Sequence, residues 1–208
     1  MWQVEKSSYL AASCDAAPHF TQVFPMASAF SHAFAAYTFK SAWAPAGLSR
    51  KAIWIGMLSA VMPDADVLAF SFGIPYEHVL GHRGITHSLF FALLWAWLMM
   101  EVFFYEYKRA GKDWWRVWLY LALCTASHGV FDALTNGGRG VAFFAPFENS
   151  RYFFPWRPIL VSPLGAANFF SEWGMRVVKS ELLYVWLPGS LLLLASWAWR
   201  FLKRKNTP

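Results

Sequence analysis

Histidines and aspartates recur at short spacings in a chain that is otherwise strongly apolar. A carboxylate or imidazole among apolar neighbours is costly to desolvate unless it is paired or binds a metal. Mixed nitrogen and oxygen ligands of this kind hold zinc, manganese or iron. The pattern therefore predicts a divalent metal site with these residues as ligands: His32, Asp64, Asp66, His82, His87, His128 and Asp132.

Two spacings support a shared site. His128 and Asp132 stand at positions i and i+4, which places them on one face of a helix. Pro63 interrupts the helix before Asp64 and Asp66, so both carboxylates can turn toward one point. Taken alone, each pair also fits a structural role, as a helix cap or as a hydrogen-bonded core histidine.

The size of the ligand set favours two ions, because a catalytic zinc normally keeps three protein ligands and an open position for water. A two-metal site generates hydroxide near neutral pH and clamps the attacking and leaving oxygens of a displacement. We therefore expect a hydrolase of a phosphoester that uses zinc, with manganese or iron as alternatives. The expected catalytic residues are Asp64, Asp66, His128, Asp132 and Arg83, and the residues expected to bind an anionic substrate are Arg83 and Arg157.

The composition indicates a membrane protein. Of the 208 residues, 57% are hydrophobic and 14% charged, and the mean hydropathy is +0.33. This balance exceeds what one soluble core of this length would bury. The net charge of +6 comes from lysines and arginines at the ends of apolar segments, so we expect contacts with lipids and no direct binding of nucleic acid. Two cysteines are too few for a cysteine-rich zinc site.

The apolar stretches predict an all-α, polytopic membrane protein with about four to five membrane helices. They cover residues 26–39, 52–73, 87–107, 114–134 and 182–202. The basic clusters fall on one side if the chain crosses the membrane five times with its C-terminus in the cytoplasm. This topology places every candidate ligand on the extracytoplasmic face of the membrane.

The sequence predicts one membrane domain over 26–208. Within it, 135–181 exceeds an ordinary connection and is expected to form an interfacial cap. Residues 1–25 have the composition of a polar extension, and Met26 is an alternative start of the native chain.

Two other classes of function are compatible with the same ligands. A membrane metal-ion carrier or sensor would bind the cation without turnover, because polar residues inside a membrane also mark ion paths. A structural membrane protein would satisfy the same side chains by hydrogen bonds. Ligands gathered at one end of the helices, rather than spread through their depth, favour the hydrolase.

Four motifs occur in order along the chain: Pro63-Asp64-Ala65-Asp66; His82-Arg83-Gly84-Ile85-Thr86-His87-Ser88; Ser127-His128-Gly129-Val130-Phe131-Asp132; and Arg151-Tyr152-Phe153-Phe154-Pro155-Trp156-Arg157-Pro158-Ile159. Together they resemble the YdjM-like family of membrane-bound metal-dependent hydrolases, also described as LexA-regulated or LexA-binding. The resemblance implies an integral inner-membrane protein of helical fold, with a metal site similar in ligand style to zinc-dependent phospholipase C. The sequence contains no DNA-binding motif, so we interpret the link to LexA as regulatory.

Overall fold

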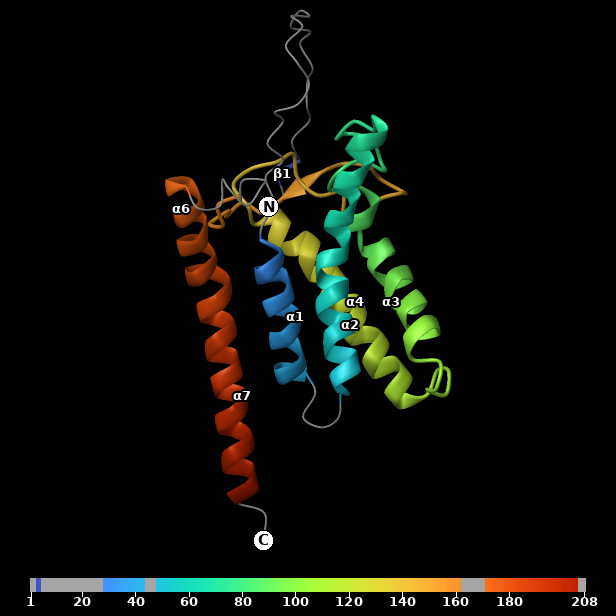
Figure 1. Ribbon diagram of the computed structural model, residues 1–208, viewed down its shortest axis with the longest axis vertical. Helices are drawn as coiled ribbons and strands as arrows, with labels where there is room; N and C mark the ends of the chain where they lie inside the picture. The colour runs from blue at the N-terminus through green and yellow to red at the C-terminus, as the bar shows by residue number, and fades with distance from the viewer. Residues whose placement is uncertain (1–2, 5–27, 44–47, 162–170, 206–208) are drawn as a thin grey trace, which may run out of the picture.

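The computed structural model describes residues 3–4, 28–43, 48–161 and 171–205, which are largely helical (Figure 1). The 3₁₀-helices are labelled η1 and η2, and η3 is a π-helical turn. The elements in chain order are β1 (Gln3–Val4), α1 (Ala29–Trp43), α2 (Arg50–Val61), η1 (Met62–Phe72), η2 (Ile85–His87), α3 (Leu89–Phe103), α4 (Lys112–Ala133), β2 (Tyr152–Phe153), α6 (Glu172–Glu181), η3 (Leu182–Trp186) and α7 (Leu187–Lys205). The expected polar extension lies outside the described residues except for β1, which pairs antiparallel with β2.

Successive helices run in opposite directions. In Figure 1, α1 descends, α2 and η1 rise, α3 descends, α4 rises, and α6 and α7 descend again. Helix α4 packs against α1, α2 and α3, while α7 packs against α1. The start of α1, the end of α2, the start of α3 and the end of α4 therefore meet at one end of the bundle.

Two helical stretches are long and apolar enough to cross a membrane, namely Arg50–Phe72 and Glu172–Lys203. Helix α3 is apolar but shorter. Large apolar side chains are exposed along α3 and α7, including Leu94, Trp97 and Leu194. Such faces suit contact with lipid. The passage of all the predicted helices through the membrane stays a prediction.

The 3₁₀-helix η1 gives its two aspartates different surroundings. Positions three apart share a face of a 3₁₀-helix. Pro63 and Asp66 are buried, Ala65 and Leu68 are exposed, and Asp64 lies between these extremes. The two carboxylates of the Asp-x-Asp motif therefore leave the helix on separate faces.

The last helical stretch begins at Glu172, ten residues before the apolar stretch 182–202 that the sequence predicts as a helix, and it therefore includes the end of the predicted cap. Ser171 caps the helix by accepting a hydrogen bond from the Gly174 N–H, and Glu172 lies in the first turn. Both features stabilise a helix start. Prediction from hydropathy missed α6 because charged residues, including Glu172, Arg176 and Lys179, recur along it.

A buried carboxylate attaches this last helix to α1. Glu181 is 4% exposed. It accepts hydrogen bonds from the Ser28 N–H at 2.7 Å, from the Ser28 hydroxyl and from the Ser31 hydroxyl at 2.8 Å. Trp186 also donates its indole N–H to Ser31. The start of α1, which carries His32, is held by this network.

Replacing Glu181 with alanine is expected to destabilise the protein by about 1–3 kcal/mol, because it leaves buried donors of Ser28 and Ser31 without an acceptor. Thermal unfolding of the detergent-solubilised protein measures the change. Arg176→Ala, at an exposed position of the same helix, is the matched control. Equal unfolding temperatures for the two variants would contradict this role of Glu181.

Candidate metal centre

Four ligand groups converge where α1, η1, η2 and α4 meet. They are the side chains of Asp64, His87, His128 and Asp132, whose ligand atoms all lie within 4.8 Å of one another. Three of these side chains are fully buried, and Asp64 retains 11% exposure. The structure thus brings together residues from three separate motifs.

The distances between these ligand atoms suit one divalent ion. Asp64 Oδ1 lies 3.1 Å from His128 Nε2 and 3.9 Å from His87 Nε2. Asp132 Oδ2 lies 3.4 Å from His87 Nε2 and 3.9 Å from His128 Nε2. Four ligands placed tetrahedrally about 2.1 Å from an ion would stand roughly 3.4 Å apart. A cation therefore fits between them with small shifts.

Backbone and carboxylate partners turn both imidazoles toward this point. His128 Nδ1 lies 2.7 Å from the Ala60 carbonyl oxygen, to which it donates. His87 Nδ1 lies 3.2 Å from Asp66 Oδ2. Each Nε2 is then left as the nitrogen with a lone pair, which is the form that binds metal.

Buried polar atoms at the centre also lack partners. Among the described residues, His87 Nε2 and Asp132 Oδ1 have no hydrogen-bond partner. Buried acceptors without a donor are costly in a protein interior. A bound cation would remove that cost, so the donor set fits a metal.

Asp66 occupies the outer edge of the cluster rather than its middle. Its Oδ1 lies 2.6 Å from His82 Nδ1, and its Oδ2 accepts from the Arg83 N–H at 3.1 Å and the Thr86 hydroxyl at 2.6 Å. Asp64 and Asp66 thus face opposite edges of the His87 ring, which differs from the expectation that both turn toward one point. The cause is the three-residue period of η1, which sends the two side chains in different directions.

His32 lies beside the four-group cluster. Its ring stacks on His128 with centroids 3.8 Å apart, and its Nε2 is 3.9 Å from Asp132 Oδ1. Neither of its nitrogens has a hydrogen-bond partner among the described residues. A small movement of the ring would make it a further ligand.

His82 and His78 lie away from the four groups. His82 forms a second group of possible ligands with Asp66 and His87. Within this group, His82 is already hydrogen-bonded to Asp66. The Nδ1 of His78 accepts a hydrogen bond from the Leu80 N–H.

Arg83 is fully buried and contacts protein oxygens with each guanidinium nitrogen. Its Nε lies 2.9 Å from Asp132 Oδ2, its Nη1 donates to the Gly137 carbonyl, and its Nη2 donates to the Thr135 hydroxyl. Its backbone has a φ of 58°, unusual for a residue with a large side chain. The structure therefore gives Arg83 a contact that positions Asp132. The exposed Arg157 lies over the Phe153 ring at 4.6 Å, and substrate binding by either arginine stays a prediction.

Comparison with known proteins identifies the relatives of this chain. A family model described as the YdjM inner membrane protein matches residues 26–207. The chain belongs to the YdjM family. The inner membrane protein YbcI of Escherichia coli strain K12 is 40% identical over 164 residues, which cover 74% of this chain and 90% of YbcI. No solved structure matches the chain. These findings confirm the family resemblance and support an inner-membrane location.

Several contacts that position side chains at the metal centre of this YdjM protein could not be predicted from the sequence, because one partner in each is a backbone atom. The Ala60 carbonyl orients His128, and the side chain of Arg151 donates to the carbonyls of His82 and Tyr76. Burial raises the pKa of Tyr76, whose hydroxyl accepts a hydrogen bond from the Arg139 N–H. A residue type gives no signal for a carbonyl contact, so only the folded backbone reveals these partners.

In this YdjM protein, Gly138→Ala is expected to lower stability by roughly 1–3 kcal/mol. Gly138 has a φ of 83°, and an added Cβ would overlap Arg83 Nη1. Because its contacts with Asp132, Gly137 and Thr135 hold the Arg83 guanidinium in place, the loop that carries Gly138 must move instead. Thermal unfolding checks the effect, with Gly73→Ala as control, since Gly73 also has a positive φ but open space around its Cβ. An equal loss in both variants would show that backbone strain alone is responsible.

Proposed function

We propose that this YdjM protein is a membrane-bound metal-dependent hydrolase that acts on a phosphoester or lipid-like substrate. The observation that carries the proposal is the convergence of two imidazoles and two carboxylates on one buried point, with acceptor atoms left without donors. Such a site selects a divalent cation.

Asp64, His87, His128 and Asp132 would hold one ion, with His32 as a further candidate ligand. When bound, the ion would supply Lewis-acid chemistry and lower the pKa of a water ligand. The group of Asp66, His82 and His87 is joined by hydrogen bonds, including the 2.6 Å contact between His82 and Asp66. We therefore assign one ion to the four-group cluster, while two-ion occupancy stays a prediction for metal analysis to test.

The protein's own residues would orient the reaction. Asp132 is held in place by Arg83, and His87 is held by Asp66. Asp64 is the one member of the four-group cluster with exposed side-chain surface. It therefore marks the side from which substrate and water approach, and its carboxylate is our candidate for accepting a proton from the attacking water.

Metal analysis of detergent-purified protein, followed by turnover assays with phosphoesters, tests the proposal. We expect bound zinc, manganese or iron in the native protein, and loss of metal and turnover in Asp64→Ala and His128→Ala. His78→Ala is the matched control because His78 lies outside both ligand groups. Native protein without divalent metal, or alanine variants that keep it, would overturn the proposal. Metal binding without turnover would instead favour the carrier or sensor.

A further inference from the structure

Helix α7 extends past the end of α1, the helix that it packs against (Figure 1). Gly189 lies opposite Phe34 and Thr38 of α1, since an added Cβ would contact both side chains. Trp186, three residues earlier, stacks on the same Phe34 ring with centroids 4.4 Å apart. The two helices run in the same direction, and α1 ends at Trp43. Helix α7 therefore continues for roughly nine residues, or about 14 Å, beyond α1.

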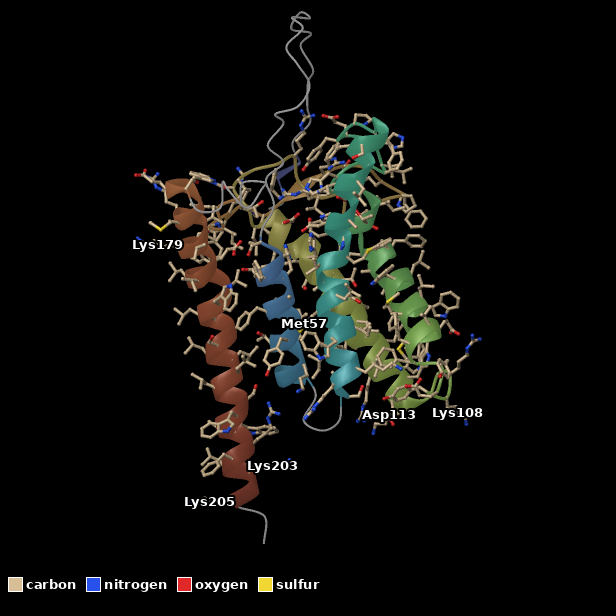
Figure 2. All side chains as sticks on the ribbon, in the orientation of Figure 1. Met57, Lys108, Asp113, Lys179, Lys203 and Lys205 are labelled. Atoms are coloured by element: carbon tan, nitrogen blue, oxygen red, sulfur yellow. The ribbon has the colours of Figure 1, made fainter. Side chains whose placement is uncertain are left out.

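The extension of α7 interleaves exposed aromatic and basic side chains. Trp197, Trp199 and Phe201 are each more than half exposed. Lys203 Nζ lies 5.3 Å from the centre of the Trp199 ring, and Lys205 Nζ lies 5.9 Å from the centre of the Phe201 ring. Figure 2 shows both lysines at the lower end of the molecule. Aromatic and basic residues together at the end of an apolar helix are typical of the head-group layer of a membrane.

The positive charge of this extension has no acidic side chain within the same segment to offset it. Residues 182–208 contain no aspartate or glutamate, and their basic residues fall close together: Arg200, Lys203, Arg204 and Lys205.

The neighbouring end of α3 and start of α4 differ in this respect, because each of their carboxylates contacts a basic residue. The pairs are Glu101 with Arg109, Glu106 with Lys51, and Asp113 with Arg116. An anionic partner therefore gains more at the end of α7, where it would be the counter-charge, than at the connection between α3 and α4.

We propose that the end of α7 is a binding surface for anionic phospholipids. The stretch Glu172–Lys203 is long and apolar enough to cross a membrane, and basic residues directly after a membrane span attract anionic head groups. The lipid phosphates would lie beside Lys203 and Lys205, with the acyl chains along exposed apolar side chains of α7 such as Leu194. This continuity of apolar and basic surface favours a lipid over a soluble anion, which would use the charges alone. The surface lies at the opposite end of the bundle from the metal centre, so it is independent of the proposed function.

Spin-labelled lipids measure the preference of the protein surface for one head group. The full chain is reconstituted in phosphatidylcholine bilayers, and the fraction of motionally restricted label is compared for phosphatidylglycerol and phosphatidylcholine with the same acyl chains. We expect the native protein to prefer phosphatidylglycerol by about twofold or more at low salt. The preference should fall as added salt screens the charges. Equal restriction of the two labels at low salt would overturn the inference.

Two double variants locate this preference on the molecule. Lys203→Gln with Lys205→Gln removes two exposed charges from the end of α7, and Arg176→Gln with Lys179→Gln removes two exposed charges from α6 at the opposite end. We expect the α7 variant to lose most of the preference for phosphatidylglycerol and the α6 variant to keep it. An equal loss in both variants would show that the net charge of the protein attracts the lipid, and would overturn the inference. A preference that persists in the α7 variant would also overturn it, because other basic residues would then bind the lipid.

Discussion

Asp132→Ala is expected to lose metal binding and about 3–5 kcal/mol of stability together. The carboxylate lies 2.9 Å from Arg83 and 3.4 Å from His87, and all three side chains are fully buried. Removing it deletes a ligand and leaves the Arg83 guanidinium buried without its counter-charge. Breaking a buried ion pair from one side has a penalty of this size. Thermal unfolding and metal analysis of the purified variant provide the two readouts.

A double variant separates the two effects of Asp132. Asp132→Ala with Arg83→Met removes both charges, so stability should recover in part while metal binding stays absent. Asp113→Ala is the control on the same helix, since Asp113 forms an exposed pair with Arg116, and such pairs contribute little. Normal metal content in Asp132→Ala would rule out Asp132 as a ligand.

Asp66→Asn is expected to weaken metal binding by roughly 10–100-fold, although Asp66 lies outside the four-group cluster. Its carboxylate accepts from His82 through one oxygen and from Arg83 and Thr86 through the other. It also faces His87 Nδ1. An asparagine amide presents donors on one side, so it cannot satisfy both sets. His87 would then lose the partner that directs its Nε2 toward the metal.

Competition of each variant with a chromophoric chelator for zinc measures this loss of affinity. Asp113→Asn, an exposed aspartate, is the control for the charge change. If Asp66→Asn removes metal completely, as Asp64→Ala is expected to do, then Asp66 is itself a ligand. If the affinity is unchanged, the orientation of His87 does not depend on Asp66.

The helical class, the approximate helix positions and the candidate ligands follow from the sequence because they depend on local features. Apolar runs set the helices, and Pro63 marks where α2 passes into η1. Ser88, which directly precedes the apolar run of α3, caps that helix by accepting from the Phe91 N–H. The family resemblance, confirmed by comparison, rests on the same short motifs. These motifs identify possible ligands, but they do not show which of them lie close enough together to bind the same ion.

Only the tertiary structure decided how those residues divide their roles. Asp64 and Asp66 are two positions apart. The 3₁₀ geometry nevertheless directs Asp64 to the four-group cluster and Asp66 to His82 and the Thr86 hydroxyl. Arg83 has the residue type of an anion binder, but burial and three oxygen partners make it the support of Asp132. Residue type and spacing determine which groups can bind a cation. The direction of each side chain depends on contacts between distant segments, and the fold alone supplies those.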